Sequence, residues 1–263
     1  IKFTSKYKNL LSSRFFCTFV FLLMKKISSA LISVFNKNKI DNLCHILSEN
    51  NVRIYSTGGT YLHIKKLGIK AKKVEDLTSY PSILNGRVKT LHPKVFGGIL
   101  KTNSKSDIED SKIYEIPNID LVVVDLYPFE DTVKNSNSHK DIIEKIDIGG
   151  ISLIRAAAKN YENVVCVSSE SQYDELIDII KNECKTNIEY RKKLAVEAFN
   201  KSSNYDSNIS YYLNKGGLNP DSDKDIIKEL RYGENPHQKG RFIGQVDKIF
   251  TQIHGKQISY NNL

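Results

Sequence analysis

The feature that most restricts the fold is a run of apolar residues near the middle of the chain. Residues 119–126 contain Leu121-Val122-Val123-Val124, four apolar residues in succession with no polar residue between them. A strand with this pattern is buried on both faces, as strands are in a parallel sheet that helices cover on each side. The run therefore predicts a parallel sheet between two layers of helices.

Strand-like and helix-like patterns alternate on both sides of this run. Further strands are predicted at residues 30–34, 52–56 and 163–168. Apolar residues at helical spacing follow each of them, and the predicted helices include 40–47, 60–67 and 172–182. This alternation is typical of an α/β fold, here a doubly wound, mainly parallel sheet with helices on both faces.

Glycine and proline mark the limits of other elements. Gly68 is placed to end the helix at 60–67, and Gly149-Gly150 is placed to open an alanine-rich helix that ends near Asn160. Residues 77–98 combine Pro, Gly and polar residues without a clear period. This segment is predicted to be a long functional loop.

The C-terminal part of the chain changes character at a stretch of turn-forming residues. Residues 188–213 are predicted to be helical, with an interruption around 201–205. Residues 214–223 are the best candidate for a linker. The segment 224–263 is too short for an independent core, so it is predicted to be an appendage or the beginning of a larger domain.

The first 23 residues have a composition of their own. They contain four basic residues, no acidic residue and an apolar run at 15–23 that is too short to span a bilayer. Met24 is the only methionine, and a globular pattern starts directly after it. We therefore expect residues 1–23 to be translated upstream sequence, with a targeting peptide as the alternative.

The charge of +9 raises the question of a nucleic-acid partner. The 39 basic residues comprise 32 Lys and 7 Arg, and the lysines are scattered along the chain. A biased coding background explains this better than a binding surface, and neither a nucleic acid nor a membrane is expected as partner.

The four cysteines, Cys17, Cys44, Cys166 and Cys184, contain no CxxC pair. They predict no disulfide framework and no zinc site, and they fit a reducing, cytoplasmic setting. No other metal site is expected either. Cys44 and Cys166 lie in apolar patterns and are predicted to be small buried hydrophobic residues.

Two segments carry the residue types that bind anions. Ser56-Thr57-Gly58-Gly59-Thr60 joins a strand to a helix, so its backbone N–H groups and the helix N-terminus are available to an anion. The alternative is a tight turn with Thr60 as the helix cap. Gly86-Arg87-Val88-Lys89-Thr90-Leu91-His92-Pro93 is the second segment, in which Arg87 offers a planar fork for phosphate or carboxylate.

Two further segments follow the central strand. Tyr127, in Asp125-Leu126-Tyr127-Pro128-Phe129, is either a hydrogen-bond donor to a developing oxyanion or an aromatic packed at the sheet edge. Asp147 precedes Gly149-Gly150, and Arg155 and Lys159 follow on one face of the next helix. Like charges on one face favour an anionic partner, either Asp147 or a ligand, and a solvated face is the alternative.

In their order and spacing, these four segments resemble the cyclohydrolase domain of bifunctional AICAR transformylase/IMP cyclohydrolase. The matching strings are STGGT, GRVKTLHP, DLYPF and DIGG with RAAAKN. The match runs from about Lys26 to Tyr212. Residues 230–238 and 254–263 resemble the opening of the transformylase domain of the same family. The resemblance implies a methylglyoxal-synthase-like cyclohydrolase domain at 24–213 and a truncated transformylase domain at 224–263.

The resemblance also implies roles for individual residues. Lys159 is implied as the proton donor or acceptor, assisted by Lys89, Tyr127 and Asp147. The implied nucleotide-binding residues are Ser33, Val34, Thr57, Gly58, Gly59, Thr60, Arg87, Val88, Thr90, Val124, Asp125 and Ile148. Arg231, Tyr232 and His237 are implied to belong to the aminoimidazole nucleotide site of the transformylase.

The chain departs from the family pattern at three places. Phe35 stands where the family usually has a serine, which removes one hydroxyl that can contact phosphate, and Asp125 stands where many members have Asn. The chain also ends before the Lys-His pair of the transformylase. Formyl transfer from 10-formyltetrahydrofolate is therefore expected only of a full-length chain, and dimerisation, which the family achieves largely through that domain, is in doubt.

The implied reaction is the ring closure of a formamidoimidazole carboxamide ribonucleotide, a purine nucleotide precursor, with loss of water. It requires proton transfer and oxyanion stabilisation, but no cofactor. The rival functions are a methylglyoxal synthase and a non-catalytic nucleotide-binding regulatory module of the same fold. The presence of Lys89, Tyr127 and Lys159 together argues against both.

Overall fold

A five-stranded parallel sheet forms the centre of the fold in the computed structural model, which describes residues 24–214, 227–232, 235, 237–243, 254 and 259–260. The strand order is β4-β3-β2-β5-β6. The strands are β2 (Ser29–Ser33), β3 (Arg53–Ser56), β4 (Ala71–Lys73), β5 (Leu121–Val124) and β6 (Val165–Val167). All four pairings are parallel, which confirms the predicted α/β class.

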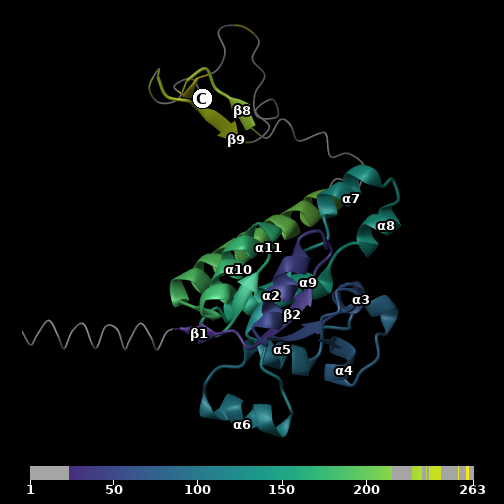
Figure 1. The fold of residues 1–263 in the computed structure, drawn as a ribbon. Helices are drawn as coiled ribbons and strands as arrows, with labels where there is room; N and C mark the ends of the chain where they lie inside the picture. Colours follow the sequence, from purple (N-terminus) through teal and green to yellow (C-terminus); the bar gives the residue numbers. More distant parts are fainter. Residues whose placement is uncertain are drawn as a thin grey trace, which may run out of the picture.

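The helices lie on both faces of this sheet (Figure 1). They are α2 (Ile40–Glu49), α3 (Gly58–Lys66), α4 (Val74–Thr78), α5 (Pro93–Leu100), α6 (Lys105–Ile113), α7 (Phe129–Asn135), α8 (His139–Glu144), α9 (Ile148–Lys159), α10 (Tyr173–Asn182) and α11 (Ile188–Asn214). The short 3-10 turns are η1 (Leu84–Gly86) and η2 (Glu170–Gln172). Among the described residues, no helix combines the length and apolar character needed to cross a membrane.

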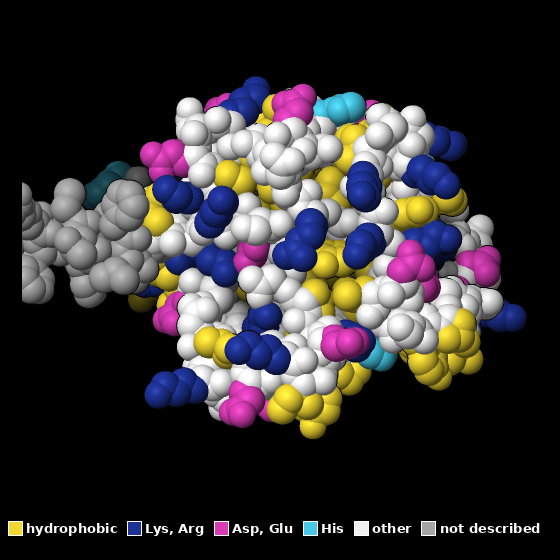
Figure 2. All heavy atoms as spheres, turned by 60° about the horizontal axis from the view of Figure 1, so that its bottom comes forward, with side chains coloured by type: hydrophobic (Ala, Val, Ile, Leu, Met, Phe, Trp, Pro, Cys, Tyr) yellow, Lys and Arg dark blue, Asp and Glu magenta, His cyan; other side chains and the backbone are white. Residues whose placement is uncertain are grey.

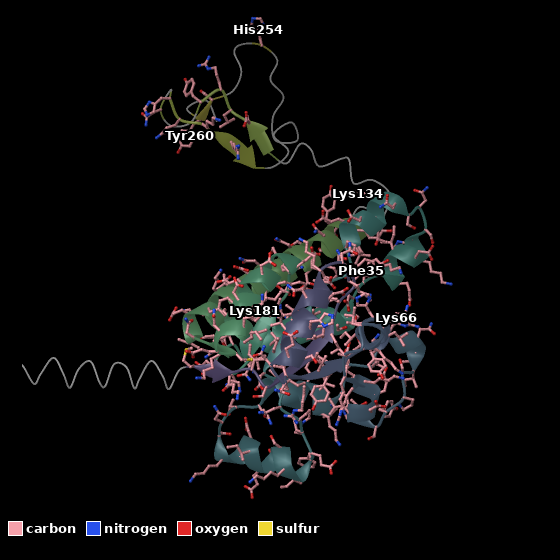
Figure 3. All side chains as sticks on the ribbon, viewed as in Figure 1. Phe35, Lys66, Lys134, Lys181, His254 and Tyr260 are labelled. Atoms are coloured by element: carbon pink, nitrogen blue, oxygen red, sulfur yellow. The ribbon has the colours of Figure 1, made fainter. Side chains whose placement is uncertain are left out.

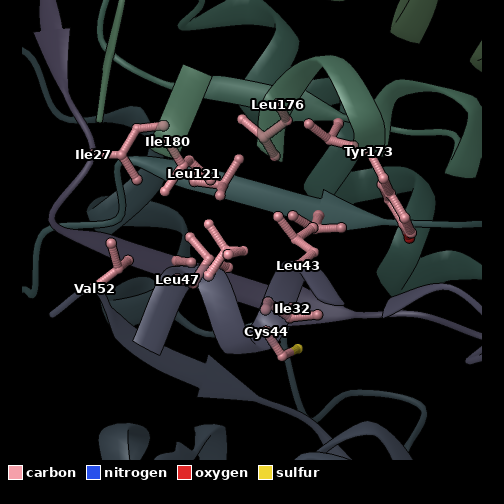
Figure 4. Packing of buried hydrophobic residues seen from close by; sticks show 14 of the residues in the cluster. Ile27, Ile32, Leu43, Cys44, Leu47, Val52, Leu121, Tyr173, Leu176 and Ile180 are labelled. Carbon is pink, nitrogen blue, oxygen red and sulfur yellow. The ribbon is translucent and has the colours of Figure 1, made fainter. Parts of the chain in front are cut away.

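Alternate residues of each central strand enter two separate cores. Ile32 and Val123 point into one core, which contains residues of α2 and α10 (Figure 4). Leu31 and Val122 point into the other, which contains residues of α5, α9 and α11. The continuous apolar run therefore has the double-sided burial that its sequence predicts. Cys44 and Cys166 are both buried in these cores, as expected.

The register of the strands brings their carboxyl ends to one edge of the sheet. Ile32 of β2 pairs with Ser56 of β3 and with Val123 of β5, so the three chains leave the sheet side by side. The opposite edge is closed by a buried carboxylate. Asp120 accepts hydrogen bonds from Ser28 N and Ser29 Oγ, each at 3.0 Å, and pairs with Lys25 Nζ at 2.8 Å.

Two short antiparallel pairs complete the described structure. β1 (Lys25–Lys26) pairs with β7 (Lys185–Thr186). In the C-terminal segment, β8 (Ile227–Glu229) pairs with β9 (Arg241–Ile243). The expected upstream segment 1–23 and the expected linker after Asn214 lie outside the described residues.

Two predictions about local structure are wrong. Residues 93–98 belong to α5 and not to a loop, because Pro93 occupies the first helical turn and His92 Nδ1 accepts a hydrogen bond from Lys94 N at 3.1 Å. Residues 188–214 form one helix without the predicted interruption. The polar residues at 201–205 continue the helix because Ser202 and Tyr205 face the core.

Two adjacent glycines of α5 give a test of how closely this helix packs. A Cβ on Gly98 would lie 2.9 Å from the Pro117 carbonyl oxygen, whereas a Cβ on Gly97 would meet only side-chain atoms of Ile116, at 3.1 Å or more. We expect Gly98→Ala to lower the free energy of unfolding by about 1–3 kcal/mol, since backbone must move. Gly97→Ala is expected to change the free energy of unfolding by less than about 1 kcal/mol. Both variants gain the same helix propensity, so the difference between their stabilities reports the packing alone.

Urea unfolding of the two variants and the wild type measures this difference. Equal stabilities of Gly97→Ala and Gly98→Ala would contradict the close packing of α5 on the segment before β5.

Candidate functional site

The carboxyl ends of β2, β3 and β5 bring the first predicted site residues together. Ser33 ends β2, and its Oγ lies 2.7 Å from Thr57 Oγ1, directly after β3. Thr60 Oγ1 accepts from Val34 N at 3.2 Å and donates to Val34 O at 3.0 Å. These contacts join the loop after β2 to the first turn of α3. Val124 itself is buried in the core, so only its backbone reaches this edge.

The start of α3 has the properties of an anion site. Its N-cap residue, Thr57, makes no side-chain hydrogen bond to the helix, so the first N–H groups of α3 are not capped in this way. Gly58 has a φ of +36°, which allows the chain to turn directly into the helix. Free N–H groups and the helix dipole together favour a bound anion.

Two lysine ammonium groups lie against this glycine turn. A Cβ on Gly58 would lie 3.3 Å from Lys89 Nζ, and a Cβ on Gly59 would lie 4.0 Å from Lys37 Nζ. Lys37 Nζ is held by the carbonyl oxygens of Val34, at 3.3 Å, and Phe35, at 3.0 Å. The sequence analysis predicts Lys89 as a site residue but does not predict Lys37, which follows Ser33 by four positions. Both ammonium groups therefore lie close to the N-terminus of α3.

Two carboxyl groups lie beside these cations. Asp125 accepts hydrogen bonds from the backbone N–H groups of Phe35 and Asn36, the second at 2.9 Å. Burial raises the pKa of Asp125, and these hydrogen bonds and Lys201 oppose that shift. The aspartate at position 125, where many members of the family that the chain resembles are expected to have Asn, accepts the two N–H groups on its two carboxylate oxygens.

Asp147 caps α9 from its N-cap position. Its Oδ1 accepts a hydrogen bond from Gly150 N at 2.7 Å. Burial raises the pKa of Asp147, and the negative charge of Asp125 adds to the rise, whereas Lys89 lowers it. A buried carboxyl with a raised pKa, next to a lysine, is suited to proton transfer.

Tyr127 follows Asp125 by two residues and makes an aromatic contact with Phe35. Its ring centroid is 4.1 Å from that of Phe35, and Lys145 Nζ lies 4.6 Å from the Tyr127 centroid. Phe35, labelled in Figure 3, is about half exposed and packs on the tyrosine ring. Phe35 therefore replaces a family hydroxyl with a ring contact that orients Tyr127. The Tyr127 hydroxyl makes no hydrogen bond with a described residue.

The loop before α5 contributes less of the site than predicted. Thr90 is buried, and its Oγ1 would lie 2.9 Å from a Cβ on Gly149, so it packs against the start of α9. Arg87 instead points to Leu84 O, at 3.0 Å from Nε, and to Glu144, at 3.6 Å. The Arg87 guanidinium thus contacts protein groups in this structure, and its role as a phosphate fork stays a prediction. Val88 is half-buried, Ile148 is exposed, and His92 shapes the loop as the α5 cap.

Helix α11 supplies two residues that the sequence did not indicate. Tyr205 is buried, and its hydroxyl accepts a hydrogen bond from Asp147 N at 2.8 Å. Lys201 Nζ donates to Ser168 O, and burial lowers the pKa of Lys201 while Asp125 opposes the shift. Both residues also line a groove of ≈ 330 Å³ between α7 and α11, together with Tyr127. Tyr205 is buried and Lys201 is half-buried, and no motif in the sequence points to either residue.

Lys159 is not part of this site. Asp147 caps the first turn of α9 and Lys159 lies in its last turn, so the two are about 18 Å apart along the helix. Lys159 is exposed, and the next residue, Asn160, bonds the carbonyl oxygens of Ile99 and Lys101 at the opposite edge of the sheet. The expectation that Lys159 shares a site with Asp147 and Lys89 is therefore wrong for a single chain. Arg155 contacts Ser202 and Phe199, and not a carboxylate.

The residues implied for a second nucleotide site lie in the C-terminal segment. Arg231 lies 4.8 Å from the centroid of the Tyr232 ring and donates to its hydroxyl at 3.1 Å. His237 is exposed. The described residues bring two of the three implied residues together. They include no group of three or more His, Cys, Asp and Glu side chains placed to hold a metal ion.

Comparison with known proteins gives matches along most of the chain. A family profile described as "MGS-like domain" matches residues 39–152, and one described as "AICARFT/IMPCHase bienzyme" matches residues 157–263. A solved structure titled "Crystal structure of ForH" superposes with a TM-score of 0.63 at 32% identity, covering 70% of this chain and 97% of that one.

Curated relatives are similar over a longer stretch. The bifunctional purine biosynthesis protein PurH of Bacteroides thetaiotaomicron is 56% identical over 242 residues, which are 91% of this chain and 48% of that protein. The PurH protein of Clostridium acetobutylicum is 45% identical over 245 residues, or 90% of this chain and 49% of that protein. The chain thus spans about half the length of the curated relatives it matches.

The two roles of Asp147, as helix cap and as buried acid, can be separated by substitution. Asparagine keeps the cap, so Asp147→Asn is expected to fold as stably as wild type, whereas Asp147→Ala loses about 0.5–2 kcal/mol. Because the folded-state pKa is raised, the folded protein binds more protons than the unfolded one, and wild-type stability falls as pH rises through that pKa. Asp147→Asn lacks this loss.

Denaturant unfolding at pH values from acidic to neutral measures both effects. The stability of Asp147→Asn relative to wild type is expected to increase with pH. A relative stability that is constant or decreases with pH would show that burial does not raise the pKa of Asp147.

Proposed function

This chain belongs to the family of the AICARFT/IMPCHase bienzyme, and we propose that its parallel-sheet domain closes the second ring of a purine nucleotide. The substrate in this proposal is a formamidoimidazole carboxamide ribonucleotide, and the products are IMP and water. One observation carries the proposal: Lys37 and Lys89 lie against the start of α3, and the charge of Lys89 also acts on the half-buried carboxyl of Asp147. Such a site can hold a phosphate at one end and transfer protons at the other.

The phosphate of the substrate binds at the start of α3 in this proposal. The ammonium groups of Lys37 and Lys89 neutralise its charge, and the N–H groups of α3 donate hydrogen bonds. Ser33 and Thr57, whose hydroxyls already lie 2.7 Å apart, add donors on the same side. This end of the site fixes the position of the ribose and therefore of the imidazole ring.

The reacting groups lie next to each other on one ring, so positioning alone lowers the barrier substantially. The carboxamide nitrogen forms a C–N bond with the formyl carbon, and the formyl oxygen becomes an oxyanion. Each of the two substrate nitrogens then loses one proton, and the oxygen departs with both as water. Asp147 accepts a proton from the carboxamide nitrogen and gives it to the departing oxygen, and Tyr127 stabilises the oxyanion. The reaction is neither an oxidation nor a reduction, and the formyl donor 10-formyltetrahydrofolate has no part in it.

The match to MGS-like domains favours a second candidate, phosphate elimination from a triose phosphate. That reaction also requires a phosphate pocket and a carboxylate base. It does not require Tyr127 held between Phe35 and Lys145, which is the feature that supports ring closure. A regulatory module of this fold would bind the nucleotide without turnover.

Formation of IMP from the formylated nucleotide, followed by ultraviolet absorbance, tests the proposal. Lys89→Met and Lys37→Met are each expected to lower kcat/KM by on the order of 10²-fold, because each removes one phosphate-binding charge. Lys66→Met removes the same charge from the exposed C-terminal end of α3 (Figure 3) and is expected to leave kcat/KM unchanged.

The same preparation separates the rivals. Release of phosphate from dihydroxyacetone phosphate without IMP formation would establish the elimination reaction. Tight binding of the nucleotide without turnover in the wild type would establish the regulatory module, and either result rejects the proposed ring closure.

A further inference from the structure

A hollow of ≈ 460 Å³ lies at the edge of the sheet opposite the candidate site. Helix α6 projects beyond the rest of the domain here (Figure 1), and the hollow, called the α6 hollow below, lies between α6 and the amino ends of the strands. Its lining residues are Arg53, Lys101, Thr102, Asn103, Ile108, Ser111, Lys112, Ile116, Pro117 and Asn118. This volume is in the range of sites that hold drug-sized ligands.

The charges that line the α6 hollow are all positive. Arg53, Lys101 and Lys112 contribute to its wall, and no acidic side chain does. Figure 2 shows Lys and Arg side chains spread over much of the face that this edge presents. Burial lowers the pKa of Lys101, and the neighbouring charge of Lys25 adds to this effect, while Asp120 opposes it. An anion in the hollow would compensate these charges.

Arg53 is the residue that sets this hollow apart from an ordinary basic surface. Its guanidinium has no hydrogen-bond, ion-pair or aromatic partner in the part of the chain that the structure describes. The other described arginines all have one: Glu144 for Arg87, Ser202 for Arg155, Tyr161 and Thr186 for Arg191, Tyr232 for Arg231 and Glu229 for Arg241. An unpaired guanidinium presents a planar fork that suits a phosphate group.

The rest of the lining suits an organic group attached to the phosphate. Ile108, Ile116 and Pro117 form an apolar side, which fits the face of a flat ring. The amides of Asn103 and Asn118 fit polar atoms at the edge of such a ring. Asn103 Nδ2 donates to Asn163 Oδ1 at 3.2 Å, so the carbonyl oxygen of Asn103 is left to accept from a ligand.

The walls of the α6 hollow are held by packing and hydrogen bonds. The Asn160 amide donates to Lys101 O at 3.0 Å and to Ile99 O at 2.7 Å. Ile116 and Pro117 pack against the two glycines of α5, as described above. The hollow is therefore formed before a ligand arrives, which lowers the entropic cost of binding.

We propose that the α6 hollow binds a phosphorylated small molecule of the mononucleotide class, separately from the candidate active site. The phosphate contacts Arg53, Lys101 and Lys112, and the base lies against Ile108 and Ile116. Helix α5 connects the two sites, since its first turn follows the loop containing Lys89 and its last residue precedes Lys101.

Calorimetric titration with AMP tests the proposal in a background that has lost the first site. The Lys37→Met/Lys89→Met variant is expected to bind one equivalent of AMP in the α6 hollow, and to bind adenosine much more weakly. Adding Arg53→Ala and Lys112→Ala is expected to weaken AMP binding at least about tenfold, because two charge-assisted contacts are lost. Adding Lys105→Ala and Lys66→Ala instead removes the same charge outside the hollow and is expected to leave AMP affinity unchanged.

Arg53→Gln in the same background removes the charge but keeps a polar side chain with the same first three carbons. It is a milder change than Arg53→Ala, and it is expected to weaken AMP binding severalfold. The proposal is rejected if the background variant binds no AMP, if adenosine binds as tightly as AMP, or if removal of Arg53 and Lys112 changes nothing. None of these outcomes depends on ring closure, because every measurement is of binding.

Discussion

Burial of β2 and β5 on both faces is the constraint on which the rest of this structure depends. Because alternate residues such as Leu31 and Ile32 enter opposite cores, a shift of either strand by one residue would place each side chain in the core that packs the other set. The fixed register places Ser33, Ser56 and Val124 at one edge, and the loops that follow them carry Lys37, the glycine turn and Asp125. The chemistry of the candidate site is thus located by an apolar core that contains none of it.

The site itself is built from groups whose burial carries a free-energy cost that a ligand can offset. Asp125 and Asp147 are both shifted toward their neutral forms, and Lys37 and Lys89 are held against backbone near a helix start that has no side-chain cap. Charged groups that are partly removed from water in this way are stabilised when a group of opposite charge binds beside them. A substrate with a phosphate at one end and exchangeable protons at the other matches the two lysines and the two aspartates, respectively.

Much of this could be predicted from sequence, and the failures have physical causes. Strands β2, β3, β5 and β6 and helices α2, α9 and α10 follow from apolar period and glycine position, whereas the short, largely exposed β4 was not predicted. Thr57 and its glycine turn follow from the junction of a strand and a helix, and Ser33 and Asp125 were implied as site residues only by the family resemblance. Helix α5 was missed because its cap is a histidine and its interior contains two glycines, and α6 because it has no apolar face. Lys201 and Tyr205 were missed because they lie on a helix that is distant in sequence from the other site residues. Lys159 and Asp147 lie in neighbouring motifs, but they are at opposite ends of α9 and are therefore far apart.

The central claim is that the start of α3, between Lys37 and Lys89, receives the phosphate of a purine nucleotide. The most direct measurement is a titration of the isotope-labelled chain with IMP, followed by the backbone amide resonances. We expect the largest shifts at Gly58, Gly59 and Thr60, with smaller ones at Gly149 and Gly150 beside Asp147. Resonances of Gly58 to Thr60 that stay unchanged while IMP binds would contradict the account.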